Sequence, residues 1–225
     1  MPRRKISQGQ CQFCQELVTK TAATRHLAKC EARQAALAKA EKQFVPEEPL
    51  FYLRAQANGA PEFWLDLEVK GNATLASLDN YLRAIWLECC DHLSQFGDFG
   101  EDELPMTGKL SRYLPVAAST LHLYDFGSTS ETVIKSVSSR IGKPLTKHPI
   151  ALLFRNALPE VECIECKAPA THFCEECRIE EDSPGWLCDE HAEDHPHDQY
   201  GEPMPLVNSP RSGMCGYDGP AEPPY

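Results

Sequence analysis

The sequence lacks any long run of apolar residues. No stretch reaches the roughly 18 uninterrupted apolar residues that a membrane-spanning helix needs. Residues 1–5 are basic, but no apolar run follows them, so they do not form a secretory signal. We therefore expect a soluble, cytoplasmic protein.

The sequence also has little that points to catalysis. It contains no recognisable catalytic triad, no phosphate-binding loop and no pair of catalytic carboxylates. Residues 98–100 and 125–127 both read Asp-Phe-Gly, as in a kinase metal motif, but the glycine-rich loop, strand lysine and catalytic loop of a kinase are missing. We expect both to be strand ends followed by turns, and the acidic residues 175–182 to form a solvated loop.

Cysteine is abundant. The chain has 11 cysteines, many of them two residues apart and accompanied by histidines. In a reducing compartment this pattern indicates metal binding rather than disulfides, and the odd total argues against complete disulfide pairing. The adjacent Cys89 and Cys90, with His92, resemble a redox or catalytic site in composition, but we expect a buried helix C-terminus there.

The first candidate metal site is Cys11-x2-Cys14-x11-His26-x3-Cys30. Zinc prefers tetrahedral sulfur and imidazole ligands, which two short knuckles can supply. The second knuckle falls on a helix expected from about residue 21 to 42, where residues four apart share a face. A minimal core would come from Phe13, Leu17 and Leu27.

A second group of ligands lies near the C-terminal end. It comprises Cys163, Cys166, Cys174, Cys177, Cys188, His191, His195 and His197, with Cys215 further along. With Cys89 and Cys90 set aside, nine cysteines and three histidines give twelve ligands. Twelve ligands fill three tetrahedral zinc sites, which predicts about three ions in all. Sites with four protein ligands are closed and therefore structural.

The pairing within this group is open. The arrangement resembles a B-box-like cross-brace, which implies one site of Cys163, Cys166, Cys188 and His191. The other site would then combine Cys174 and Cys177 with His195 or His197 and with Cys215. A sequential alternative places the first four cysteines on one ion. Cys215 has a second interpretation as a buried free thiol.

Hydrophobic patterning predicts an α+β fold in three parts. Residues 6–42 would be a C2HC-type zinc finger, residues 50–157 an α+β domain, and residues 159–225 a B-box-like module with two zinc ions. Alternation over residues 63–69, 120–126 and 132–137 indicates strands. Thr74 is the expected N-cap of a helix whose apolar residues have helical spacing. The expected order is β-β-α, a loop region, then β-β-β.

Residues 63–96 and 124–131 resemble the plasmid open-reading-frame-three-like family of the Ri plasmid type. Residues 206–217 resemble the ending of its zinc-bearing members. The resemblance implies a compact, β-grasp-like α+β domain, an association with plasmids and mobile elements, and a ligand role for Cys215. It implies no catalytic residues.

The net charge of −11 is unevenly distributed: +6 over residues 1–42, −4 over 43–158 and −13 over 159–225. We expect a non-catalytic, zinc-binding adaptor whose basic finger contacts nucleic acid or an acidic protein, with a solvated helix face as an equally weighted interpretation. The acidic module should contact a protein. The alternatives are an enzyme of a mobile-element-associated family, either zinc-dependent or using the surface of the central domain around His92, and a purely structural subunit. The expected contact residues are Arg3, Arg4, Lys5, Lys20, Arg25 and Lys29.

Overall fold

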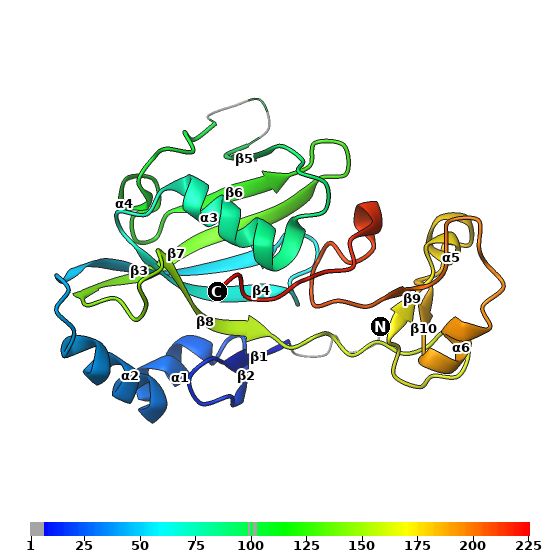
Figure 1. Cartoon of the computed structure of the whole chain (residues 1–225), viewed down its shortest axis with the longest axis horizontal. Coiled ribbons are helices and arrows are strands. Elements are labelled where there is room, and N and C mark those ends of the chain that lie inside the picture. Colours follow the sequence, from blue (N-terminus) through cyan, green and yellow to red (C-terminus); the bar gives the residue numbers. More distant parts are fainter. Residues whose placement is uncertain (1–6, 99, 101–102) are drawn as a thin grey trace.

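A computed structural model describes residues 7–98, 100 and 103–225. It confirms the mixed α+β class (Figure 1). The centre is an eight-stranded sheet with the order β2-β1-β8-β4-β3-β7-β6-β5, in which all the strand pairings are antiparallel. No helix in the described ranges is long and apolar enough to cross a membrane. The strands are β1 (Gln8–Cys11), β2 (Leu17–Thr19), β3 (Glu48–Ala57), β4 (Trp64–Lys70), β5 (Ser94–Phe96), β6 (Ser119–Tyr124), β7 (Ser130–Gly142) and β8 (Ile150–Asn156).

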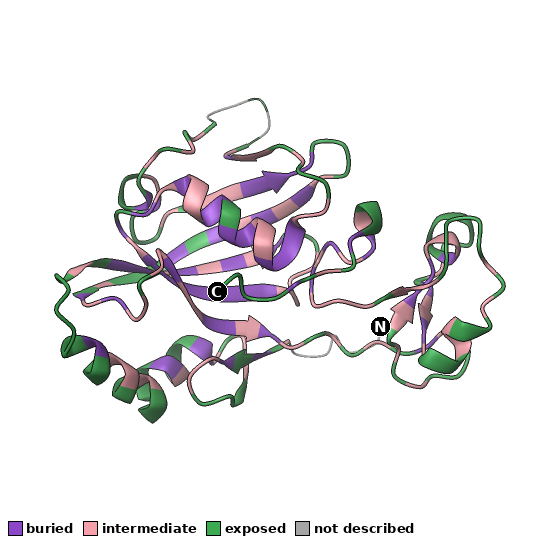
Figure 2. Cartoon of the chain, in the orientation of Figure 1, coloured by how far each residue is buried: buried purple, intermediate pink, exposed green. Residues whose placement is uncertain are grey.

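Strand β4 is buried on both faces (Figure 2). Leu65, Leu67 and Val69 belong to the main apolar core, while Trp64 belongs to a second core that includes residues of the finger. Asp66 and Glu68 alternate with the leucines, as the period of two predicts. Both carboxylates are buried and therefore paired with arginines: Asp66 with Arg54 of the neighbouring β3, and Glu68 with Arg140 of β7, on the far side of β3.

Helix α3 (Leu75–Leu82) covers the main core. As predicted, Thr74 is its N-cap, and the Thr74 hydroxyl accepts a hydrogen bond from the backbone N–H of Ser77 at 3.2 Å. The helix then widens into a π-helical turn, η1 (Arg83–Leu87), and ends at Glu88. Such π-turns frequently occur beside functional sites. The expected buried helix end at Cys89 and Cys90 is therefore wrong, because Cys90 is exposed in the chain that follows.

The segment after η1 is more structured than the expected loop. It contains β5 at the edge of the sheet and the short helix α4 (Leu110–Tyr113). Residues 125–127 form a turn between β6 and β7, as predicted, with Asp125 at a positive φ of 65°. Residue 99 lies outside the described residues, so the structure of the other Asp-Phe-Gly segment is not assigned.

The finger segment is continuous with the central sheet. Strand β1 pairs with β8, so the hairpin of β1 and β2 extends the sheet. The single helix expected over residues 21–42 is instead two helices, α1 (Ala23–Lys29) and α2 (Glu31–Glu41), because Cys30 leaves the helical conformation with ψ at 110°. Leu27 is buried against Trp64 and Phe154 of the sheet, and the Leu17 side chain is exposed, so the finger is not limited to a core of its own.

The C-terminal segment forms a small module beside the sheet. Its three-stranded sheet has the order β10-β9-β11, and its core includes cysteine ligands and Leu187. The tail then returns to the central sheet and ends near it (Figure 1). The elements are β9 (His172–Phe173), α5 (Glu175–Glu180), β10 (Trp186–Leu187), α6 (Asp189–Glu193), β11 (Met204–Pro205) and the 3-10 turn η2 (Met214–Gly216).

Candidate metal centres

Four groups of cysteine and histidine side chains converge in the described residues, and within each group the candidate ligand atoms lie within 4.8 Å of one another. Each group has four members. Together they include all 11 cysteines of the chain. The groups are Cys11, Cys14, His26 and Cys30; Cys163, Cys166, Cys188 and His191; Cys174, Cys177, His195 and His197; and Cys89, Cys90, His92 and Cys215.

The separations between ligand atoms match a tetrahedral ion. Zinc–sulfur bonds of about 2.3 Å and zinc–nitrogen bonds of about 2.0 Å place two sulfurs about 3.8 Å apart, and a sulfur and a nitrogen about 3.5 Å apart. The Sγ atoms of Cys166 and Cys188 are 3.7 Å apart. Cys14 Sγ lies 3.4 Å from His26 Nε2. The groups can therefore hold metal ions.

The finger group brings together all four residues predicted for it. Cys11 ends β1, Cys14 lies in the following turn, His26 is on α1 and Cys30 lies between the two helices. The positive φ of Gln15, 63°, turns the chain after the first knuckle. Burial raises the pKa of the Cys11 thiol to about 11. Since only a deprotonated thiol binds zinc, loading this site releases protons.

The two groups of the C-terminal module interleave in the cross-braced manner. Cys163 and Cys166 converge with Cys188 and His191, not with the two cysteines of the next knuckle. His191 Nδ1 is 3.2 Å from Cys188 Sγ and 3.7 Å from Cys163 Sγ. The geometry thus favours the cross-brace over the sequential alternative.

The second module group uses both candidate histidines. Cys177 Sγ is 3.3 Å from His195 Nε2 and 3.3 Å from His197 Nδ1. Because both imidazoles complete this group with Cys174, it has no place for Cys215. The expected role of Cys215 as the fourth ligand here is wrong, as is the choice of only one of the two histidines.

Local backbone geometry positions these knuckles. Helix α5 begins directly after Cys174, whose sulfur accepts a hydrogen bond from the backbone N–H of Cys177 at 3.5 Å. Gly185, with φ at 66°, passes so close that a Cβ there would lie 2.4 Å from the Cys174 carbonyl oxygen. Burial raises the pKa of the Cys163 thiol, but backbone hydrogen bonds from Cys166 and others outweigh it, so the pKa falls to about 6. That thiol is prepared to bind metal as a thiolate.

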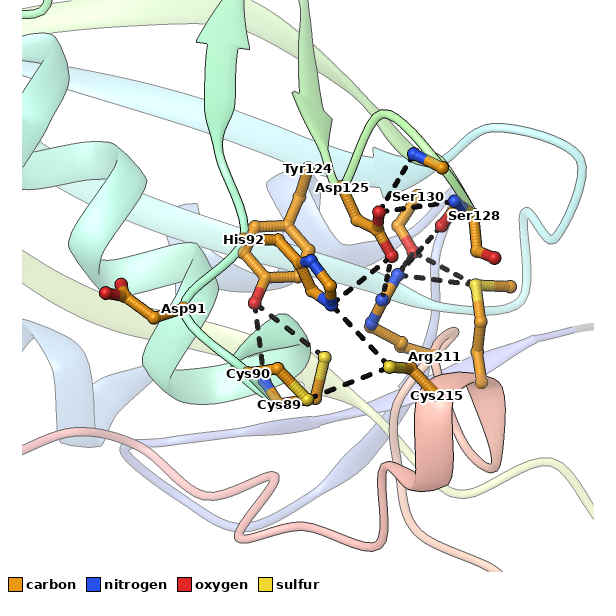
Figure 3. Close-up of polar contacts among 12 residues, drawn as sticks. Cys89, Cys90, Asp91, His92, Tyr124, Asp125, Ser128, Ser130, Arg211 and Cys215 are labelled. Atoms are coloured by element: carbon orange, nitrogen blue, oxygen red, sulfur yellow. Dashed lines mark hydrogen bonds and ion pairs between the residues drawn. The ribbon is translucent and has the colours of Figure 1, made fainter.

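The fourth group was not predicted. Cys89, Cys90 and His92 follow η1, and Cys215 lies in η2 of the tail (Figure 3). Cys215 Sγ lies 3.7 Å from Cys90 Sγ and 3.6 Å from His92 Nε2. The count of three groups is therefore too low, since Cys89 and Cys90 are members of a cluster. The sequence signal available was the short spacing of Cys89, Cys90 and His92.

Polar residues surround the fourth group (Figure 3). Asp125 Oδ2 lies 3.6 Å from His92 Nε2 and accepts a hydrogen bond from Arg211 at 2.5 Å. The Arg211 guanidinium holds the pKa of Asp125 down at about 2. Burial raises the pKa of the Cys89 thiol, but hydrogen bonds from Arg211 and Tyr124 outweigh this effect and lower it.

The residues predicted to contact a polyanion are only partly available for that role. Arg25 and Lys29 are exposed on α1. Lys20, in contrast, donates to Gln56 Oε1 and to the Pro61 carbonyl oxygen, each at 2.8 Å, so its ammonium group is already used within the fold. Its role as a contact residue stays a prediction. Arg3, Arg4 and Lys5 lie outside the described residues.

Comparisons with known proteins leave the family open. No protein-family model and no curated protein matches the chain. One similar solved structure, a protein of unknown function, MM3350, from Methanosarcina mazei Go1, is 21% identical. The match covers 48% of this chain and 69% of that one, with a TM-score of 0.40. The resemblance to the plasmid open-reading-frame-three-like family, with its β-grasp-like fold, thus receives no support here and stays a prediction.

Proposed function

We propose that this protein is a zinc-stabilised, non-catalytic binding protein that joins a polyanionic partner to a second protein. The observation that carries the proposal is the convergence of three four-ligand groups in the finger and the module. Four protein ligands complete the tetrahedral coordination of zinc, as in structural sites, whereas catalytic zinc keeps one position open. These three ions would therefore serve folding rather than chemistry.

Zinc is the metal that best fits the donor set. The three groups contain only thiolates and imidazoles, which favour zinc over the oxygen-seeking magnesium and calcium. In the module, the buried residues around Leu187 are largely the ligands themselves. Structural zinc contributes about 10–16 kcal/mol of apparent binding free energy to folding, far more than such a small core supplies.

The exposed basic residues of α1 support a polyanion contact. Arg25 and Lys29 are four residues apart and so share one face of the helix. Leu27 and His26 point into the fold and the metal group, which leaves the basic side chains in solvent. Two cations on a rigid, zinc-held helix suit phosphate contacts that position a partner without reading its sequence.

The module offers the opposite charge. Asp189, Glu190 and Glu193 are exposed on α6, and Asp194 and Asp198 are exposed just after it. This surface repels nucleic acid and suits a basic protein surface. The two ends of the chain would thus select different partners.

The polyanion contact is tested by anisotropy with labelled duplex DNA and single-stranded RNA over a range of salt concentrations. The variant Arg25→Glu/Lys29→Glu should bind at least about tenfold more weakly. The slope of the logarithm of its binding constant against the logarithm of the salt concentration should be shallower by about two. The matched control is Lys109→Glu/Arg112→Glu, which makes the same charge change on two exposed residues, one just before α4 and one within it. Equal weakening in both variants, or no salt-dependent binding by the wild type, would refute this contact. Hydrolysis or transfer at a metal site with a bound water would favour the enzyme alternative.

A further inference from the structure

The exposed group of Cys89, Cys90, His92 and Cys215 is not needed for the proposed function. We propose that it is a fourth metal site, one that takes a thiophilic divalent cation such as zinc, clasps the tail onto the central sheet and exchanges its ion more readily than the other three sites do. This inference goes beyond the structural role assigned to those three ions.

The geometry is that of a metal site rather than a disulfide. The 3.7 Å between the sulfurs of Cys90 and Cys215 and the 3.6 Å from Cys215 Sγ to His92 Nε2 match tetrahedral edges of about 3.8 and 3.5 Å. A disulfide requires about 2.05 Å between sulfurs. Cys89 brings a third thiol within the same 4.8 Å limit.

The backbone adopts unusual conformations to present these ligands. Asp91, between Cys90 and His92, has φ at 57°, and Cys215 itself has φ at 55°. Gly213 and Gly216 flank that turn with φ at 79° and 70°. Non-glycine residues in the left-handed region are uncommon, and such strain is concentrated at functional sites.

Residues 208–211 also anchor the tail to the central sheet. The Asn208 side chain accepts a hydrogen bond from the Asn156 side-chain amide and donates one to the Asn156 backbone carbonyl oxygen, at the end of β8. The Ser209 hydroxyl donates to the Trp86 carbonyl oxygen in η1 at 2.6 Å. Arg211, fully buried, bonds to Asp125. These anchors deliver Cys215 to the other three ligands, so the site is assembled in advance.

Charged side chains lie directly beside the group. Three thiolates around a divalent cation carry one net negative charge. The buried Arg211 guanidinium lies next to the group, with its own charge balanced by Asp125. Asp125 Oδ2 lies 3.6 Å from His92 Nε2, the same ring nitrogen that faces Cys215 Sγ, so this carboxylate lies at the edge of the group.

Exposure distinguishes this site from the others. Cys90 and Cys215 are exposed and Cys89 and His92 are half-buried, so none of the four ligands is buried. Each of the other three groups contains at least one buried cysteine. The ligands of the fourth group also come from two segments, because Cys215 is 123 residues or more from the other three. Each of the other groups is formed within one short stretch of the chain. A chelator can therefore reach this ion first, and its loss frees the clasp without unfolding a module.

Native mass spectrometry of the full chain, loaded with zinc under reducing conditions, tests the proposal. The wild type should carry four ions, and Cys215→Ser and Cys90→Ser should each carry three. The control His148→Gln changes a histidine outside every group and should keep four. With a chromogenic chelator, one ion of the wild type should be released in a separate fast phase that both serine variants lack.

Other outcomes would overturn the inference. A wild type with three ions would do so while leaving the proposed function intact, whereas a wild type with no ions would defeat both. Four ions in both serine variants, or a wild type that lacks two hydrogens through a Cys90–Cys215 disulfide under the same conditions, would also overturn it. Hydrogen exchange over residues 212–217 should rise when the fast-released ion is removed. Unchanged exchange would show that the ion does not hold the tail on the central sheet.

Discussion

Arg211 and Asp125, 86 positions apart in the chain, form a buried ion pair with 2.5 Å between Nη2 and Oδ2. Arg211 is 0% exposed, and its other terminal nitrogen donates to the Ser128 carbonyl oxygen and the Ser130 hydroxyl. The pair fixes the returning tail to the turn between β6 and β7. It also lies directly behind the fourth metal group (Figure 3).

Replacing Arg211 by Met should release the tail. Removing one partner leaves the Asp125 carboxylate buried without its cation, which costs about 3–5 kcal/mol. Chemical denaturation should show that loss, and the chelator assay should show that the fast-released ion is bound more weakly. The control Arg112→Met removes an exposed arginine of α4 and should change stability by no more than about 0.5 kcal/mol. Similar losses in both variants would contradict this role.

The cross-brace can be tested by ion counts in the module. Cys163 and Cys174 belong to different ions in the observed grouping but to one ion in a sequential pairing. Each single serine variant should therefore lose about one ion, and Cys163→Ser/Cys174→Ser should lose two. Native mass spectrometry provides the counts, and Cys14→Ser, which acts on the finger alone, is the control. A double variant that loses no more than either single variant would support the sequential pairing.

Gly213 couples the tail to the module. Its φ is 79°, and a Cβ there would lie 2.0 Å from Phe173 Cζ on β9. Gly213→Ala should thus destabilise the protein both through backbone strain and through displacement of the Phe173 ring, by about 2–4 kcal/mol in total. Thermal or chemical denaturation would measure it.

Gly59 provides the matched control for that variant. Its φ of 81° is nearly the same, but a Cβ there would meet nothing within 4 Å. Gly59→Ala should therefore cost only the strain of the left-handed conformation, about 1–2 kcal/mol. If the two variants cost the same, the contact between Gly213 and Phe173 is not what makes glycine necessary at position 213.

Local sequence spacing was sufficient to predict three of the four groups approximately. Cys11 and Cys14, or Cys163 and Cys166, form knuckles because a two-residue gap allows one turn to place both sulfurs on an ion. The same holds for the alternation along β4 and for the N-cap at Thr74, which depend on neighbours in the chain. Features of this kind are encoded within about ten residues.

The rest depends on contacts between distant segments. Cys215 meets His92 from 123 positions away, and no spacing rule connects them. Counting only one of the two histidines as a ligand left a place for Cys215 in the module. The structure instead brings both His195 and His197 to Cys174 and Cys177. Similarly, the pairing of β1 with β8 could not be read from the finger alone, because an edge strand accepts a partner from any part of the chain.

The central claim, that thiolates and imidazoles of this chain hold zinc, is tested most directly by the native mass of the purified protein together with elemental analysis. The account predicts zinc as the bound metal, with three ions that resist the chelator and one that is released first. A mass equal to that of the bare reduced polypeptide, for a protein that remains folded, would contradict it.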